Sequence, residues 1–229
     1  LYFYKLKIDP KKPGLPDRDR FVLSKGHASP AYYAALAMKG YFDKKKLESF
    51  RKLGGLQGHP ELKTPGVDFA GGSLGQGVCF ANGLALAGKI DKKNYKVYVL
   101  IGDGEAQEGS VWEAAMAAAH HKLDKLVVIL DKNQVQETGK TKEVMNIDPA
   151  ADKWKAFGFE VFDIDGHNIE EIAKTLDKAD KTKGKPVMIV ANTIKGKGVS
   201  FMELNHKFHG KAPDDEQFKK AMKELDEND

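Results

Sequence analysis

The stretch Gly102-Asp103-Gly104-Glu105 directly follows an apolar run at residues 96–101 (KVYVLI). A second apolar run, at residues 126–130 (LVVIL), leads to Asn133, thirty positions after Asp103. Short apolar runs that end in glycine or in small polar residues are typical of buried strands. These two runs therefore predict two strands, each ending in an oxygen-bearing side chain.

The segment between the two runs predicts how the strands are joined. Residues 110–121 are rich in alanine, and their apolar positions recur at helical spacing, so the unit predicts strand, helix, strand. Such a unit closes right-handed and brings both strand ends to one edge of a parallel sheet. Asp103 and Asn133 are then expected side by side, next to glycines that let a ligand approach the backbone. Hard oxygen donors beside an accessible backbone suit Mg²⁺ shared with a diphosphate.

The rest of the chain continues the alternation of strands and helices. Further strands are expected at 19–24, 159–163 and 186–191, and a polar loop at 137–146. Helices are expected at 30–38, 44–52, 149–157, 169–177 and 214–227, and one that starts at the glycine-rich segment 70–77 and runs to about 86. This order predicts an α/β fold with a doubly wound, mostly parallel sheet and helices on both faces. We expect a single domain over residues 1–229, with a helical tail from about residue 212.

Composition excludes several classes of protein. The chain has 229 residues, 41% of them hydrophobic, and no apolar run of eighteen residues, so no membrane partner is expected. Its net charge of +4 comes from lysines interleaved with acids, with only three arginines, which argues against nucleic-acid binding. A single cysteine, Cys79, predicts a reducing, cytoplasmic location.

The residues around Asp103 indicate a protein family more specifically than the spacing between Asp103 and Asn133 does. Residues 102–109 read Gly-Asp-Gly-Glu-Ala-Gln-Glu-Gly and are followed by Trp112-Glu113-Ala114. This segment resembles the transketolase family, in particular its thiamine-diphosphate-binding domain. The resemblance implies thiamine diphosphate and Mg²⁺ as cofactors, with Ca²⁺ or Mn²⁺ possible in place of Mg²⁺. It implies Asp103, Asn133 and the backbone carbonyl of Val135 as metal ligands, and backbone N–H groups of Gly104 and Glu105 as phosphate donors.

Histidines in loops form the second group of candidates. On their own, such dispersed residues have no metal-ligand spacing and are more often structural. The resemblance assigns a catalytic role to His27, in Ser-Lys-Gly-His-Ala, and to His59, in Gly-His-Pro. In the final pair, His209, which precedes a glycine, is preferred over His206 as a catalytic and cofactor-binding residue. Imidazole can donate to phosphate oxygens and exchange protons near neutral pH.

The resemblance also implies further cofactor contacts and an interface. Gly72 and Leu74, in a Gly-Ser-Leu-Gly segment that could otherwise be a simple tight turn, are expected to meet the cofactor through backbone groups. Lys195 and Lys25 are expected to add positive charge near the diphosphate or a phosphorylated substrate, and Gln136 is expected to contact the cofactor or the sugar. Glu108 and Glu113 are expected at the interface with a partner chain, although an acidic residue in a first helical turn is also favoured by the helix dipole.

A complete transketolase needs a second domain, which binds the pyrimidine ring of the cofactor and the anionic end of the sugar. The chain is therefore expected to be one subunit of a split enzyme that acts on phosphorylated sugars. Its partner would be a carboxy-terminal transketolase subunit, in a hetero-oligomer with two copies of each chain. A family segment with an additional histidine is expected to precede Leu1. Two alternatives remain: a non-catalytic cofactor-binding module, and part of an enzyme similar to deoxyxylulose-phosphate synthase.

Overall fold

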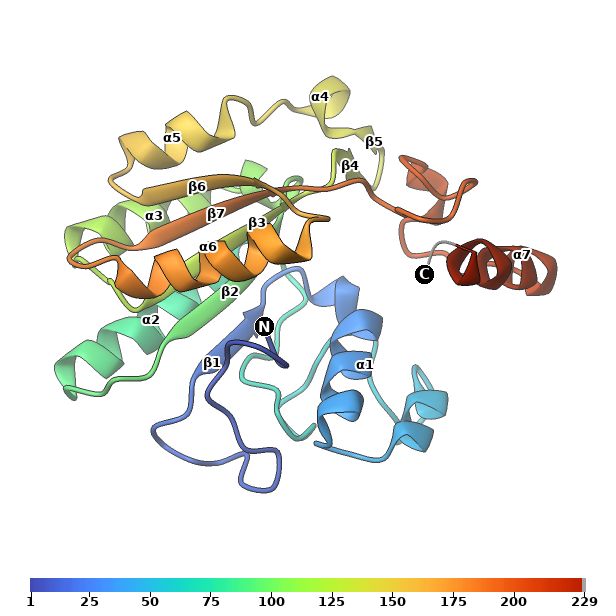
Figure 1. Cartoon of the computed structure of the whole chain (residues 1–229), viewed down its shortest axis with the longest axis horizontal. Helices are drawn as coiled ribbons and strands as arrows, with labels where there is room; N and C mark the ends of the chain where they lie inside the picture. Colours follow the sequence, from blue (N-terminus) through green and yellow to red (C-terminus); the bar gives the residue numbers. More distant parts are fainter. Residues whose placement is uncertain (228–229) are drawn as a thin grey trace.

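A sheet of five parallel strands forms the centre of the structure, in the order β1-β2-β3-β7-β6 (Figure 1). The structure is a computed structural model that describes residues 1–227. The strands are β1 (Arg20–Leu23), β2 (Val97–Gly102), β3 (Leu126–Lys132), β6 (Glu160–Asp165) and β7 (Val187–Asn192). The chain runs outward through β1, β2 and β3, passes over one position to β6, and returns to form β7 beside β3. The predicted doubly wound, parallel α/β fold is confirmed.

Helices cover both faces of this sheet (Figure 1). One face packs against three helices, α2 (Gln76–Ile90), α3 (Gly109–His120) and α5 (Ala150–Ala156). The other packs against α1 (Ser29–Lys39) and α6 (Ile169–Lys181). Successive strand residues alternate between the two cores: Val127 packs with α1 and α6, whereas Val128 packs with α2, α3 and α5. Burial on both faces explains why the central strands β2, β3 and β7 are largely apolar in the sequence.

Short elements complete the chain. They are η1 (Gly26–Ala28), η2 (Lys44–Ser49), η3 (Glu105–Gln107), the hairpin β4 (Val135–Gln136) and β5 (Gly139–Lys140), α4 (Thr141–Val144), η4 (His206–Phe208) and α7 (Asp215–Asp226). Helix α7 lies at one end of the molecule, away from the sheet (Figure 1). Within residues 1–227, no helix is both long and apolar enough to cross a membrane.

Two local predictions were wrong. Residues 44–52 do not form an α-helix: Asp43 caps the 3₁₀ helix η2, which ends at Ser49 because Phe50 is extended and Arg51 has a positive φ of 58°. Residues 137–146 are not simply a polar loop, because β5 pairs with β4 and α4 follows directly. Helices α2 and α6 both run about one turn further than expected, to Ile90 and Lys181.

Candidate functional site

The carboxyl ends of β2 and β3 open into a cavity of about 610 Å³. Register places Gly102 of β2 beside Asp131 of β3, so the segments that follow the two strands start side by side. Most of the predicted site residues line this one cavity: His27, Gly72, Leu74, Asp103, Gly104, Glu105, Glu108, Asn133, Val135, Gln136, Lys195 and His209. Lys25 also lines it. The topology therefore gathers residues from widely separated stretches of the sequence.

Asp103 is held in place by donors from three segments. It is 2% exposed. One carboxylate oxygen accepts a hydrogen bond from the backbone N–H of Gly104 at 2.8 Å. The other accepts from the backbone N–H of Gln134 at 2.7 Å and from the hydroxyl of Thr141 at 3.0 Å. Since each carboxylate oxygen offers two lone pairs, the first oxygen retains one for a cation.

Asn133 is oriented by its neighbours. Its amide nitrogen donates to Asp131 at 3.0 Å, and its amide oxygen accepts from the backbone N–H of Val135 at 3.1 Å. The bond to a carboxylate assigns the nitrogen and the oxygen, because a carboxylate only accepts. The amide oxygen keeps a lone pair, so Asn133 can act as an oxygen ligand beside Asp103.

Asp131 links this amide to a lysine. Its carboxylate accepts from the ammonium of Lys25 at 2.6 Å and from the hydroxyl of Thr193 at 2.5 Å. Burial acts to raise the pKa of Asp131, but the charge of Lys25 and the hydrogen bonds outweigh it and hold the pKa below its usual value. Asp131 therefore stays ionised, and it fixes both Lys25 and Asn133.

The side chain of Glu105 has a structural role, which is separate from the role predicted for its backbone N–H. Its side chain is 1% exposed and accepts hydrogen bonds from Ser24, from the backbone N–H of Gly75 at 2.8 Å and from that of Gly102 at 3.1 Å. Burial raises its pKa. One carboxylate thus ties the end of β1 and the start of α2 to the end of β2. The backbone N–H of Glu105 remains a candidate phosphate donor.

Two of the predicted histidines lie against each other. The rings of His27 and His209 stack with centroids 5.0 Å apart. Burial, together with the charge of Lys25, lowers the pKa of His27 to about 4, and burial with the charge of Lys195 lowers the pKa of His209. Both rings are therefore neutral at pH 7. His206 lies in η4 and does not line the cavity.

The remaining candidates lie at or beyond the rim. His59 is exposed and does not line the cavity, but a Cβ atom built on Gly72 would lie 3.6 Å from its ring. The side chain of Gln136 accepts from Gln107 at 2.6 Å. Glu108 lines the cavity, whereas Glu113 on α3 does not; both are exposed in this single chain.

The residues present fit both a divalent cation and a diphosphate. Residues 1–227 hold no cluster of three or more His, Cys, Asp or Glu side chains that could bind a metal, so the donor set is mixed. One carboxylate, one amide oxygen and the carbonyl of Val135 are hard donors that leave room for phosphate oxygens and water, as Mg²⁺ requires.

Unsatisfied groups supply the fit to an anion. Nδ1 of His209 is buried without a hydrogen-bond partner among residues 1–227. Among residues 1–227, the ammonium group of Lys195 forms no ion pair. Burial and the nearby charge of Lys25 lower the pKa of Lys195. A buried polar atom without a partner costs free energy, and a diphosphate oxygen would remove that cost.

Two residues of this site, Asp131 and Thr141, were not among the sequence-based candidates. Asp131 follows the apolar run by one position, and a carboxylate at a strand end, two residues before Asn133, was a signal that could have been used. Thr141 lies in the segment expected to be a loop, and nothing local links it to Asp103, which is 38 positions away.

Comparisons with known proteins agree on one family. The family described as "Transketolase, thiamine diphosphate binding domain" matches residues 1–228. Among curated proteins, the chain is 48% identical to a 6-deoxy-6-sulfo-D-fructose transketolase subunit of Clostridium sp. (strain MSTE9), covering 99% of this chain and 83% of that protein. It is 43% identical to an apulose-4-phosphate transketolase subunit of Phocaeicola vulgatus, covering 99% and 81%.

A solved structure gives the same result for the fold. The transketolase of Campylobacter jejuni superposes with a TM-score of 0.86 at 39% identity. The match covers 96% of this chain but only 36% of the other, so this chain spans about a third of that enzyme.

Proposed function

We propose, because this chain belongs to the transketolase family and matches its thiamine diphosphate binding domain, that it is the diphosphate-binding subunit of a transketolase assembled from two kinds of chain. In this proposal it holds the Mg²⁺–diphosphate end of the cofactor. A partner subunit supplies the domain that binds the pyrimidine ring. The relatives that are named as subunits, and that this chain covers by four fifths or more, support this division.

A single observation carries the proposal. Asp103 and Asn133 present oxygen donors at one edge of the sheet, and His209 and Lys195 line the same cavity. The buried Nδ1 of His209 has no hydrogen-bond partner among residues 1–227. The cavity therefore offers ligands for a cation and ligands for an anion. Diphosphate with Mg²⁺ satisfies both requirements together, whereas either ion alone would leave half of these groups without a partner.

The residues around the cavity would have distinct roles. When bound, thiamine diphosphate would supply the carbon nucleophile that carries a two-carbon ketol unit from a ketose to an aldose. His27, neutral at pH 7, can accept a proton from a sugar hydroxyl. His59, whose ring would lie 3.6 Å from a Cβ built on Gly72, is proposed to contact the same sugar. His209 and Lys195 would hold the diphosphate, with Gly72, Leu74, Gly104, Glu105 and Gln136 lining its place.

The substrate is proposed to be a sugar with an anionic end. The names of the two relatives include a sulfonated ketose and a phosphorylated one. The side chains that would select between the two anions are expected on the partner subunit, as the resemblance to complete transketolases implies. We propose an assembly with two copies of each chain.

Reconstitution tests the proposal. The chain would be mixed with a carboxy-terminal transketolase subunit, thiamine diphosphate and Mg²⁺, and ketol transfer from a ketose phosphate or ketose sulfonate to an aldose phosphate would be measured. We expect transfer by the mixture and none by either chain alone. Steady transfer by the 229-residue chain alone, at ordinary enzymatic rates, would show that the chain is not half of a split enzyme.

Variants of the histidines separate their roles in the reconstituted enzyme. His27→Ala and His59→Ala should lower turnover more than cofactor affinity, and His209→Ala should chiefly lower cofactor affinity. His206→Ala is the matched control, because that side chain lies outside the cavity. Unchanged kinetics in the first three variants would show that these loops are structural.

A further inference from the structure

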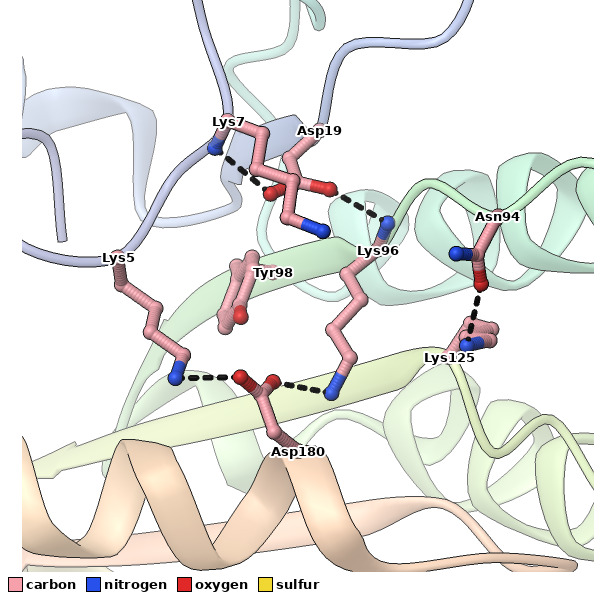
Figure 2. A pocket seen from close by; sticks show the side chains of 8 residues that line it. All are labelled: Lys5, Lys7, Asp19, Asn94, Lys96, Tyr98, Lys125 and Asp180. Carbon is pink, nitrogen blue, oxygen red and sulfur yellow. Dashed lines mark hydrogen bonds and ion pairs between the residues drawn. The ribbon is translucent and has the colours of Figure 1, made fainter.

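A second cavity, of about 200 Å³, lies at the amino ends of β1, β2 and β3 (Figure 2). The candidate functional site lies at the carboxyl ends of the same strands. Since β2 has six residues and a strand rises about 3.3 Å per residue, the two sites are roughly 20 Å apart. The charged side chains of this second cavity are Lys5, Lys7, Asp19, Lys96, Lys125 and Asp180.

Two of the four lysines are already paired. Lys5 and Lys96 both form ion pairs with Asp180, at the carboxyl end of α6 (Figure 2). Lys5 also reaches Asp177, at 2.7 Å. The two lysine side chains are only 11% and 13% exposed. These pairs bind the amino-terminal segment and the start of β2 to α6, and they use up the charge of Asp180.

The carboxylate of Asp19 accepts hydrogen bonds from backbone N–H groups. Its two carboxylate oxygens accept from the backbone N–H groups of Lys7 and Lys96, each at 2.8 Å, and the residue is 4% exposed (Figure 2). These bonds join the amino-terminal segment to the start of β2. Asp19 therefore contributes negative charge to the cavity but makes no ion pair with an ammonium group within residues 1–227.

The other two lysines have no carboxylate partner among the described residues. The ammonium of Lys125 donates to the amide oxygen of Asn94 at 2.8 Å, and that of Lys7 forms no ion pair in residues 1–227. Both line the cavity, and Figure 2 shows the side chain of Lys7 directed toward Tyr98 and Lys96. Four ammonium groups stand against two lining carboxylates and Asp177, the second partner of Lys5, which leaves an excess of one positive charge.

A neutral donor completes the lining. Tyr98 is 1% exposed, and its hydroxyl makes no hydrogen bond to residues 1–227. Burial, with the nearby Asp180, raises its pKa far above the usual value, so the hydroxyl keeps its proton and can donate. Burial lowers the pKa of Lys96, and Lys125 and Lys5 add to this by repulsion, although Asp180 acts against it. An anion in the cavity would reduce that repulsion.

We propose that this cavity binds a phosphate group between Lys7 and Lys125, with the hydroxyl of Tyr98 as a further donor. The volume of about 200 Å³ compares with about 30 Å³ for a water molecule in the liquid, so a phosphate group fits with water beside it. The group is either free inorganic phosphate or the terminal phosphate of a small metabolite. Because its ligands come from the amino-terminal segment, from β2 and from the residue before β3, the bound phosphate stabilises the fold at a distance from the cofactor cavity.

Titration of inorganic phosphate into the ¹⁵N-labelled chain tests the proposal. The backbone amides of Lys7 and Lys96 are the reporters, because both donate to Asp19 beside the cavity. We expect saturable shifts of these two signals, with a dissociation constant on the order of millimolar. Phosphate that enters the cofactor cavity would instead shift the amides of Gly104 and Glu105, so the two sites are resolved in one experiment.

A double variant supplies the decisive comparison. Lys7→Gln/Lys125→Gln removes two charges but breaks no ion pair of the described residues, so the fold is retained. We expect the affinity of this double variant for phosphate, measured from the Lys96 amide signal, to be at least tenfold lower than that of the wild type. Lys11→Gln/Lys12→Gln is the control, since it removes the same charge from exposed positions near the same segment and should bind phosphate like the wild type.

The source of the phosphate group is distinguished by a second ligand. Glycerol phosphate that shifts the reporters as strongly as inorganic phosphate identifies a terminal phosphate ester as the ligand class, and a response to inorganic phosphate alone identifies the free ion. If neither ligand shifts the reporters in a saturable way, or if the Lys7→Gln/Lys125→Gln variant binds like the wild type, the cavity is not a phosphate site.

Discussion

Among single residues, Asp131 organises more of the candidate site than its place at the end of β3 suggests. Its carboxylate accepts from Lys25, Asn133 and Thr193. The Lys25–Asp131 pair is largely buried, with side chains 11% and 27% exposed. Removal of one partner from such a pair leaves an uncompensated charge, which costs more than the pair itself contributes.

We therefore expect Asp131→Asn to lower the free energy of unfolding at pH 7 by roughly 2–3 kcal/mol, somewhat below the range for fully buried pairs. Because the folded pKa of Asp131 is lowered, this stabilisation is complete above the usual value of 3.8 and is lost as pH falls through the lower folded pKa. Urea unfolding at pH 7 and near pH 2 measures both effects. Asp152→Asn, which loses only an exposed pair with Lys155, is the control. An equal loss of stability in the two variants at pH 7 would contradict this role.

His27 should titrate far from the range of an exposed imidazole. Its pKa of about 4 compares with about 6.5 in an unfolded chain. Between these values the unfolded chain binds the extra proton and the folded chain does not, so stability should fall as pH falls from 6.5 to about 4. The ring protons of His27, followed by NMR, should show a midpoint near 4 that rises when an anionic diphosphate binds with Mg²⁺. A midpoint near 6.5 in the free chain would show that the ring is not buried as described.

The sequence predicted the residues of the site that lie in strand-end motifs, and it missed those defined only by the fold. Asp103 and Asn133 could be paired because a right-handed crossover brings consecutive strand ends together. The contact between Thr141 and Asp103 depends on how the β4–β5 hairpin folds back. No local pattern encodes that contact, because it joins segments whose spacing is set by tertiary packing.

At the scale of elements, the connection from the glycine-rich segment into α2 is tightly constrained. Gly75 caps α2 with a φ of 82°, and its N–H donates to the buried carboxylate of Glu105. A Cβ atom at this position would lie 3.0 Å from the Cβ of Glu108 and would also clash with the hydroxyl of Ser110. Only glycine combines this backbone conformation with this close approach.

Gly75→Ala should therefore lower the free energy of unfolding by about 1–3 kcal/mol, through backbone strain and the clash. Chemical denaturation provides the measurement. Gly14→Ala is the matched control, because no atom lies within 4 Å of a Cβ built there, and it should change stability little. If the two variants are equally stable, the Gly75 turn is not the constrained element described.

Most elements followed from periodicity, and the exceptions have local causes. The central strands β2, β3 and β7 are apolar on both faces, so they stand out in the sequence. Residues 44–52 have helical spacing, but the turn at Arg51, with its positive φ, ends the helix early. The β4–β5 hairpin has only two residues in each strand, too few for an alternation to be recognised.

On the scale of the whole molecule, two exposed acidic residues mark a surface that a partner chain could cover, and one of them, Glu108, lines the cavity. Glu108 and Glu113 are both at or near the start of α3 in the single chain. In a symmetric assembly these carboxylates would come close to their equivalents and would repel one another unless they share protons or water. Such a contact would couple the two cofactor sites.

Glu113→Gln should leave assembly of the reconstituted enzyme intact and change how the second cofactor binds relative to the first. Analytical ultracentrifugation reports the assembly, and calorimetry the two binding steps. Glu143→Gln, an exposed acid on α4, is the control. An unchanged ratio of the two affinities in Glu113→Gln would remove Glu113 from the proposed interface.

Calorimetric titration of thiamine diphosphate into the reconstituted enzyme, with Mg²⁺ and with a chelator, shows whether Asp103 and Asn133 hold a cation shared with a diphosphate. We expect at least a tenfold loss of affinity without Mg²⁺, about 1.4 kcal/mol. In Asp103→Ala the dependence on Mg²⁺ should disappear, whereas Asp152→Ala should bind like the wild type. Equal affinity of the wild type with and without Mg²⁺ would show that these two residues hold no cation shared with the diphosphate.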